Sequence, residues 1–542
     1  MRYLDLIAQQ PLAWGLFLAY VGATSYLAWL GHRKTKDIVS YAIGSRDMSA
    51  WIVGITLAAS IASTATFVIN PGFVFVHGVS ALMHLGVAAG LGITAGLIVM
   101  SVGFRRIGAK SAAITLPQWI GQRYGSRALT IFFAATNLLS LTFVVLIVGG
   151  ISIVMQQVMG LTNLEALTIT IVFVFSYIFA GGTWAHAYTN TLQGTIMVAV
   201  ALVIIASGAR HFSDGIGPFL DRLAAIDPNL VLAINPESAL FSSPFAVWVC
   251  GLIVGFALVC QPHIMTKALY VKSDREVWKY LGICLLVSVA FTALLLVGLW
   301  ARVGSIPAAA FLDPATGAFR QDTVMAVYLA QTFGPVTLAF ISVAILAAGM
   351  STLDGILVAL SSIAANDLVL QLGRRRLAGK TEAERLHFGH RASQVILVLM
   401  GVAAFWLALH PPKLLGIFGQ LGVYGIVAAS TVPILFGILI PRMNAATAGA
   451  AAVSGIAIHF GLSWLGRWAV ANGIDLAEGA SSWPIVLQWV ADTRAVQLGL
   501  LNPAVTATYG LLSSAAVAGV GLALTALVRK PDSGSEPSPI AP

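Results

Sequence analysis

The chain has 542 residues, of which 58% are hydrophobic and only 9% are charged, with a formal net charge of +9. Soluble domains carry about 25% charged residues, so this composition excludes an ordinary soluble protein and indicates an integral membrane protein. The positive charge requires no nucleic-acid partner, because inner loops that face anionic lipid account for it. The three cysteines have neither disulfide nor zinc spacing.

Apolar runs of about 20 residues recur along the chain and suit membrane helices better than the strands of an outer-membrane barrel. An N-terminus outside the cell puts 22 of the 30 Lys and Arg residues into inner loops, so the positive-inside rule favours an N-out, C-in topology. The first span is expected to stay uncleaved. We predict thirteen spans, at residues 13–31, 51–70, 79–103, 129–158, 163–181, 190–208, 246–267, 278–301, 333–364, 393–409, 415–440, 444–465 and 504–528.

Two of these spans are interrupted at mid-depth. The second has four hydroxyl side chains at mid-span, from Ser60, Ser63, Thr64 and Thr66, and is followed by Asn-Pro-Gly, and the seventh contains Gln-Pro-His at residues 261–263. Proline breaks the helical ladder and frees carbonyl groups, and interrupted helices in corresponding halves are typical of transporter sites. We therefore predict inverted five-helix repeats, spans 2–6 and 7–11. Proline-kinked helices that pack for stability are the alternative.

With these two repeats, we expect the chain to have five parts and no soluble domain. The five parts are the first helix with a cytoplasmic loop (1–48), the first repeat (49–209), an external loop with the second repeat (210–442), the last two helices (443–528) and a disordered cytoplasmic tail (529–542). Glycines at four-residue spacing, Gly86 with Gly90 and Gly92 with Gly96, are expected to mark close helix packing.

The ninth span contains a single charge, Asp354, and a carboxylate at membrane depth marks a candidate functional site. Ala348, Ser351 and Thr352 share one helix face and would offer a carbonyl and two hydroxyl oxygens. In the interrupted second span, further carbonyls would come from Ala59 and Ala62. Five neutral oxygens suit sodium, a small hard cation. The alternative is that both hydroxyls bond back to their own helix.

Four stretches resemble the sodium:solute symporter family, which includes sodium-coupled proline, pantothenate, monocarboxylate and sugar transporters. AAGMSTLDG (347–355) resembles its sodium-binding helix, and CQPHIMTKALYVKS (260–273) resembles the GQPHI-type motif of its proline branch. YIFAGGTWAHAYTNTLQG (177–194) resembles its GG…WTDxxQ stretch, and residues 418–450 resemble its late core helix. The resemblance covers about residues 40–465.

The resemblance implies an all-α, LeuT-like inverted-repeat fold and sodium-driven uptake by alternating access. Its sodium ligands correspond to Ala59, Ala62, Ala348, Ser351 and Thr352. Its substrate positions carry over less closely. His84 would donate to a carboxylate or accept a proton, unless a neighbouring helix satisfies it. The residues expected near the substrate are Thr66, His84, Gln261 and Tyr424.

The chain departs from the family pattern at two positions. Ile61 stands where many relatives have a polar or acidic residue, and Asn190 replaces an aspartate that helps some relatives form a second sodium site. As a hypothesis, Asp354 supplies the carboxylate that the Asn190 helix lacks, so that both residues belong to a second cation site. The rival hypothesis makes Asp354 a proton carrier.

We therefore expect a sodium-coupled symporter that imports a small amino acid such as proline, or a monocarboxylate, across a bacterial-type inner (plasma) membrane. Its partners would be that solute, sodium and the lipid bilayer, with no nucleic acid and no cofactor. A proton-coupled symporter using Asp354 and a membrane sensor domain with a symporter fold remain alternatives. No nucleophile–base or metal-ligand spacing indicates an enzyme.

Overall fold

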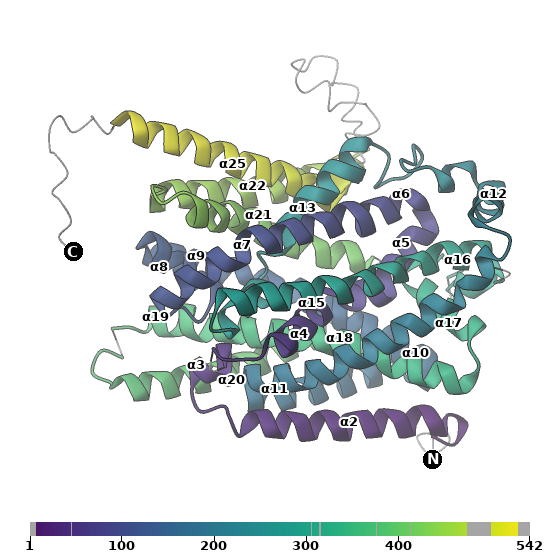
Figure 1. Cartoon of the computed structure of the whole chain (residues 1–542), viewed down its shortest axis with the longest axis horizontal. Coiled ribbons are helices and arrows are strands. Elements are labelled where there is room, and N and C mark those ends of the chain that lie inside the picture. Colours follow the sequence, from purple (N-terminus) through teal and green to yellow (C-terminus); the bar gives the residue numbers. More distant parts are fainter. Residues whose placement is uncertain are drawn as a thin grey trace.

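We describe the protein from a computed structural model, which covers residues 7–528 apart from residues 45, 305, 314–315, 376, 412–413 and 474–499. These residues are helical or irregular, with one isolated β-bridge between Leu312 and Phe319. The helices lie along the long axis of Figure 1, with α2 (Pro11–His32) at one side and α25 (Pro503–Val528) at the other. The tail predicted for residues 529–542 lies outside the described residues.

Ten helical segments of the described chain are long and apolar enough to cross a membrane. Besides α2 and α25, they are α6–η2–α7 (Val79–Leu82, Met83–Ala88, Ala89–Ser111), α9–η3–α10 (Arg127–Asn137, Leu138–Ser140, Leu141–Met159), the second part of α11 (Asn163–Ser207), α15–η8–α16 (Asp274–Ala293, Leu294–Leu296, Val297–Val303), α18–η11–α19 (Pro335–Ile363, Ala364–Val369, Leu370–Leu372), α20 (Glu382–Leu409), α21 (Leu415–Leu439) and α22 (Ala445–Ala471).

Two further spans are broken, and they are the two that the sequence predicts to be interrupted. The first break bends the chain by 48° and the second by 60°. Pro262 explains the second, because it has no amide hydrogen and holds Gln261 in an extended conformation (φ −66°, ψ 138°). The paired elements are α4 (Ala50–Ile61) with η1–α5 (Ala65–Ile69, Asn70–His77), and η6–α13 (Phe245–Val249, Cys250–Leu258) with α14–η7 (Pro262–Met265, Thr266–Tyr270).

Predicted spans five and six are joined in α11, a helix of 45 residues with a kink at Gly182. Gly182 has φ 51°, and a Cβ atom there would lie 2.5 Å from the Tyr41 ring. Only glycine fits this close, left-handed turn. The part before the kink, Asn163–Phe179, is apolar but shorter than the ten spanning segments, so the count of thirteen spans stays a prediction.

Glycines bring α7 and α13 into close contact, as the four-residue spacing predicts. A Cβ atom on Gly92 would lie 2.2 Å from the Leu252 carbonyl oxygen, and one on Gly96 would lie 2.6 Å from that of Phe256. The prediction is wrong for Gly90, which has no neighbour within 4 Å because it faces a cavity. Spacing alone does not distinguish a packed face from a hollow one.

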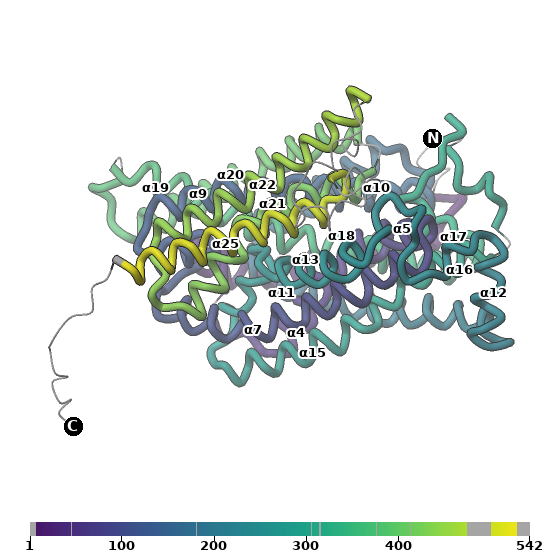
Figure 2. Tube along the Cα trace, turned by 90° about the horizontal axis from the view of Figure 1, so that it is seen from above, coloured from purple at the N-terminus to yellow at the C-terminus, as the bar shows by residue number. Residues whose placement is uncertain are grey.

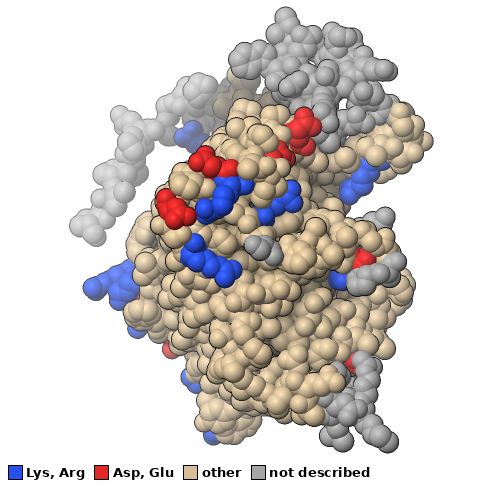
Figure 3. Space-filling model, turned by 90° about the vertical axis from the view of Figure 1, so that its right-hand side faces the viewer, with Lys and Arg blue, Asp and Glu red and all other residues tan. Residues whose placement is uncertain are grey.

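α2 begins at the end of the bundle that carries α12 (Ile216–Ile226) and α17 (Val324–Thr332), on the right of Figure 1. We call this end the N-terminal face. α8 (Leu116–Tyr124) and α19 lie at the opposite end, and Figure 2 shows the same separation from above. Figure 3 looks onto the N-terminal face, where basic and acidic side chains lie next to one another. The predicted N-out topology puts this face outside the cell.

One basic residue that the sequence places in an inner loop is not a loop residue. Lys267 lies on η7, in the second half of the broken seventh span, and its side chain is fully buried. The predicted span ends at residue 267, whereas the helical segment continues to Tyr270. The positive-inside count therefore includes one lysine that belongs to the protein interior.

Candidate functional site

The break in the second span exposes backbone oxygens at mid-depth. α4 ends at Ile61, and Ala62 leaves the helix with φ −81° and ψ 70°. Helical hydrogen bonding resumes at the Ser63 carbonyl, which accepts from the N–H groups of Thr66 and Phe67, and η1 begins at Ala65. Among the described residues, no donor reaches the Ala62 carbonyl. The chain thus keeps an unused carbonyl oxygen, that of Ala62, at a point where membrane helices normally have none.

Two hydroxyl groups of α18 lie against this break. Ser351 Oγ is 3.0 Å from the Ala59 carbonyl oxygen and 2.8 Å from that of Ala348. Thr352 Oγ1 is 3.4 Å from the Ala59 oxygen and 3.2 Å from that of Ser60. Both side chains are fully buried. The structure therefore brings four of the five predicted sodium ligands together and adds the Ser60 carbonyl, which the sequence reasoning missed.

Ala62 is the fifth predicted ligand, and its carbonyl is available, but its part in ion binding stays a prediction. All the oxygens gathered at the break are neutral and hard, as sodium prefers. The hydroxyls donate to the carbonyls here. A bound cation would take the place of these donated hydrogens, because a hydroxyl that turns its hydrogen away presents a lone pair.

Asn190 of α11 ties the two sides of this cluster together. Its Nδ2 donates to the Ser351 carbonyl at 3.0 Å and to Ser60 Oγ at 3.3 Å. Its Oδ1 is buried and has no partner among the described residues. Asn190 therefore lies beside the candidate sodium ligands and keeps one amide oxygen unused.

Asp354 lies one turn beyond Ser351 and faces α11. Its carboxylate accepts hydrogen bonds from the hydroxyl of Tyr177 and, at 3.1 Å, from that of Thr189. Thr189 is the neighbour of Asn190 in the chain, but Asn190 itself makes no hydrogen bond to the carboxylate. Asp354 and Asn190 thus lie in one polar region without a hydrogen bond between them, and their joint role as a second cation site stays a prediction.

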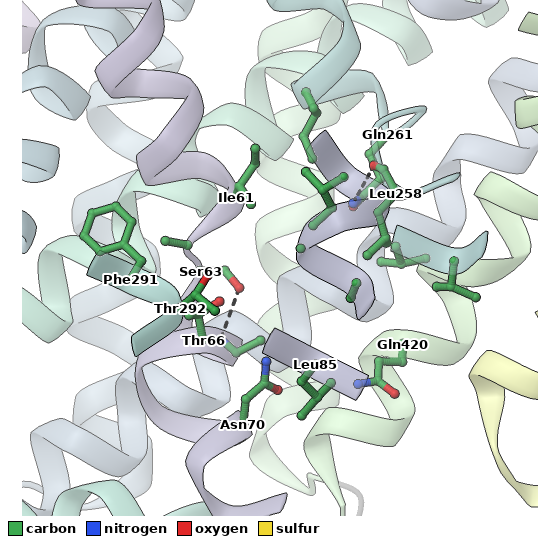
Figure 4. A pocket seen from close by; sticks show the side chains of 18 of the residues that line it. Ile61, Ser63, Thr66, Asn70, Leu85, Leu258, Gln261, Phe291, Thr292 and Gln420 are labelled. Carbon is green, nitrogen blue, oxygen red and sulfur yellow. Dashed lines mark hydrogen bonds between the residues drawn. The ribbon is translucent and has the colours of Figure 1, made fainter. Parts of the chain in front are cut away.

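A cavity with a volume of about 170 Å³ lies beside the first break. This volume accommodates on the order of ten water molecules, which suits a small solute. All four residues predicted near the substrate line it, namely Thr66, His84, Gln261 and Tyr424. Figure 4 shows Thr66 and Gln261 on opposite sides of the cavity. No Asp, Glu, Lys or Arg side chain contributes to the described lining.

Several polar residues of the lining were missed in the sequence. They are Asn70, Ser288, Thr292 and Gln420. Asn70 shares a helix face with the predicted Thr66, Gln420 with the predicted Tyr424, and Ser288 with Thr292, each at i and i+4. Figure 4 shows Thr66, Asn70 and Thr292 close together and Gln420 across from Asn70. Polar pairs at this spacing in otherwise apolar spans would have indicated these lining residues from the sequence alone.

Two of the predicted substrate residues already have partners. Gln261 Nε2 donates to the Leu258 carbonyl at 3.1 Å, a bond drawn in Figure 4. His84 Nδ1 lies 2.8 Å from the Ala246 carbonyl oxygen. A carbonyl only accepts, so Nδ1 carries the hydrogen, and the neutral ring presents an acceptor at Nε2. A donor role for His84 would require a protonated ring.

Comparisons with known proteins agree on the family. Residues 41–455 match the sodium:solute symporter family. The sodium/pantothenate symporter of Haemophilus influenzae is 24% identical over 456 residues, which cover 83% of this chain and 90% of that protein. The sodium/proline symporter of Escherichia coli is 25% identical over 475 residues, which cover 84% of this chain and 89% of that protein.

The fold is also that of solved symporters. A Na⁺-coupled sialic acid symporter, solved in a substrate-bound outward-open state, superimposes with a TM-score of 0.72 over 95% of this chain and 98% of that chain, at 15% identity. This likeness confirms the all-α, LeuT-like fold that the sequence predicts. The expectation of a transporter rather than an enzyme is confirmed as well, because the relatives are symporters.

Proposed function

Because the chain belongs to the sodium:solute symporter family, we propose that it imports a small amino acid such as proline, or a monocarboxylate, together with sodium. The protein is a multi-pass membrane transporter, and we place it in the plasma membrane of a bacterial cell with the N-terminal face outside. Sodium would be its coupling ion, and no further cofactor is required. Substrate and sodium would bind from the N-terminal face and leave at the opposite end.

A single observation carries the sodium assignment. The Ser351 and Thr352 hydroxyls reach the Ala59 and Ser60 carbonyls across the break in the second span, at 3.0 to 3.4 Å. A sodium ion held by these groups, with Ala62 and Ala348, would join the broken span to α18. Sodium would then bind more tightly to the arrangement in which the broken span and α18 lie together. Such a difference in affinity is required to couple an ion to a conformational change.

The cavity supports the proposed class of substrate. The lining formed by the described residues contains no Asp, Glu, Lys or Arg side chain, so it offers nothing to neutralise a multiply charged solute. A zwitterion carries no net charge, and a monocarboxylate carries one that a neighbouring sodium ion offsets. The acceptor at His84 Nε2 suits the ammonium or secondary-amine hydrogens of an amino acid, which favours the amino acid of the two. The names of the proline and pantothenate relatives agree with a small carboxylate-bearing solute.

The test is thermal stability of the purified protein, measured with sodium or potassium and with a panel of small amino acids and monocarboxylates. We expect sodium to raise the melting temperature, and one solute to raise it further only when sodium is present. Stabilisation by a solute that is independent of sodium, but grows with acidification, would instead select the proton-coupled alternative. A panel with no stabilising solute in either salt would contradict the proposed substrate classes.

A further inference from the structure

A buried lysine with no acidic partner among the described residues lies on η7, one helical turn after the cavity residue His263. Lys267 is fully buried, and its Nζ lies 2.8 Å from Nε2 of His186 on α11. Among the described residues, no carboxylate forms an ion pair with it. A buried ammonium whose only hydrogen-bond partner is a neutral ring is poorly compensated, so this pair requires an explanation.

The two bases share one hydrogen bond, and neither protonation state satisfies both. When Lys267 is an ammonium, Nε2 of His186 accepts, and the ring hydrogen lies on Nδ1, which is buried without a partner among the described residues. When Lys267 is a neutral amine, Nε2–H of the ring donates to it, and Nδ1 is a bare acceptor. The two states differ by one proton and by one unit of charge.

The neighbours favour neither state outright. Asp354 is the acidic group whose charge reaches Lys267, and it is already held by Tyr177 and Thr189. α4 carries no titratable side chain. Other titratable groups on the elements packed around the pair include His263 and Tyr270 on α14–η7, and Cys284 and Tyr280 on α15. Tyr41 on α3 (Ile38–Ile43), Tyr20 on α2, and Arg105 and Arg106 on α7, which Asp274 binds, are further ones.

The pair also lies close to the candidate sodium ligands. His186 is one helical turn from Asn190, whose amide donates to the Ser351 carbonyl. On the other side, Gly355 of α18 lies close to both His186 and His263, because a Cβ atom there would lie 3.3 Å from His186 and 3.6 Å from His263. His263 lines the cavity, and its Nε2 has no partner among the described residues.

We propose that the Lys267–His186 pair binds a proton and that sodium displaces it. The proposal rests on the sodium site proposed above. On sodium entry, the Lys267 ammonium passes one proton to Nε2 of His186, and the ring gives up its Nδ1 proton to cavity water by way of His263. The neutral amine of Lys267 then accepts the hydrogen bond from Nε2–H. Sodium and the Lys267 ammonium repel each other. At a separation of about 10 Å and an effective dielectric constant near 20, this repulsion lowers the affinity for sodium and the affinity for the proton roughly tenfold each.

The experiment measures proton release when sodium is added to the purified full-length protein in weak buffer with a pH indicator. Choline chloride at equal ionic strength is the salt control. We expect wild-type protein to release up to one proton per bound sodium, and its sodium affinity to rise with pH, because the ion and the proton compete. Lys267→Met should release none while sodium still raises its melting temperature.

Asp367→Asn is the matched control, because Asp367 is also fully buried but is held by Thr115 and Asn366 on another part of the chain. It should release protons as wild type does. His186→Gln replaces Lys267→Met if the latter fails to fold. Sodium stabilisation without proton release, or equal release from Lys267→Met and wild type, would overturn the proton proposal alone. If sodium fails to stabilise wild type at any pH, the sodium site and this proposal both fall.

Discussion

Ser351 and Asp354 lie one turn apart on α18, yet their side chains contact different neighbours. The Ser351 hydroxyl faces the broken second span, whereas the Asp354 carboxylate faces two hydroxyls of α11. The two residues can therefore be tested separately. A substitution of Ser351 removes the hydroxyl that faces the second span and leaves the bonds of Asp354 to α11 in place. A substitution of Asp354 does the reverse.

Ser351→Ala removes one proposed sodium ligand. We expect the sodium dissociation constant to rise about tenfold to a hundredfold, because each 1.4 kcal/mol of lost binding energy is a factor of ten. Sodium-dependent shifts in melting temperature measure it. Ser342→Ala is the control: Ser342 is a buried hydroxyl of the same helix that bonds back to the Leu338 carbonyl at 2.7 Å. A similar loss of sodium affinity in both variants would contradict a ligand role for Ser351.

Asp354→Asn tests the second cation site. If the carboxylate attracts a cation near Ser351, its removal should raise the sodium dissociation constant about tenfold, since the attraction at about 6 Å is a few kcal/mol before desolvation. The double exchange Asp354→Ser with Asn190→Asp should restore part of the affinity, because it returns a carboxylate to this region. Sodium titration of the three proteins decides it. Wild-type sodium affinity in Asp354→Asn would show that the carboxylate has no such role.

The residues of the site differ in how far the sequence reveals them. Ser351 and Thr352 were predictable because helix geometry puts them on one face and because a hydroxyl pair in an apolar span is conspicuous. The partners of Asp354 were not, because Tyr177 and Thr189 belong to a helix far away in the sequence. Lys267 was misplaced for a related reason: a lysine near the end of an apolar run reads as a loop residue until its neighbours are known.

At the scale of helices, α7 and α13 show how glycine sets the distance between two elements. Gly92→Ala would put a methyl group 2.2 Å from the Leu252 carbonyl oxygen, so the helices must separate. We expect a loss of about 1–3 kcal/mol in stability, the usual cost of overpacking. Thermal unfolding in detergent measures it.

Gly90→Ala is the matched control on the same helix, because nothing lies within 4 Å of the added Cβ atom. It should leave stability unchanged or raise it by roughly 0.5–1 kcal/mol, the usual helix preference for alanine over glycine. If both variants melt at the same temperature, the close contact between α7 and α13 does not exist in the membrane protein as described.

The two breaks illustrate what local sequence can and cannot indicate about an element. Pro262 predicts its break directly, because a proline cannot donate within a helix. The break at Ala62 has no proline at the point where the helix stops. It was inferred from the run of hydroxyls and from the downstream Asn-Pro-Gly, and its position to the residue required the structure.

For the whole molecule, the halves of the bundle differ. The cavity is lined by the part of the second span after its break and by the first turns of α21, which are nearest the N-terminal face. Beyond the cavity lining, towards the opposite end, every residue from Met265 to Tyr270 is buried. The structure is therefore hollow towards one face and packed towards the other, which is the asymmetry that alternating access requires.

A loop at the N-terminal face gives the molecule a pH-dependent stability. Asp322 lies on η10 (Gln321–Thr323), and its carboxylate accepts a hydrogen bond from the backbone N–H of Leu415, the first residue of α21. Burial raises the pKa of Asp322 to about 6, and the bond to Leu415 only partly opposes this. The folded protein therefore prefers the protonated form more than the unfolded chain does.

The stabilisation from Asp322 is complete below the unfolded pKa of about 3.9 and is lost as the pH rises through about 6. Asp322→Asn cannot ionise, so it escapes this loss. We expect the melting temperature of Asp322→Asn, relative to that of wild type, to rise between about pH 4 and about pH 7. Above that range the difference should stay constant. Parallel melting curves over this range would mean that the carboxyl group is not buried in the folded protein.

The central claim is that sodium binds between the broken second span and α18. Binding of radiolabelled sodium to the purified protein tests it most directly. We predict saturable binding that unlabelled sodium displaces, that potassium does not displace, and that disappears in the double variant Ser351→Ala with Thr352→Ala. Equal binding to the double variant and to wild type would contradict the account.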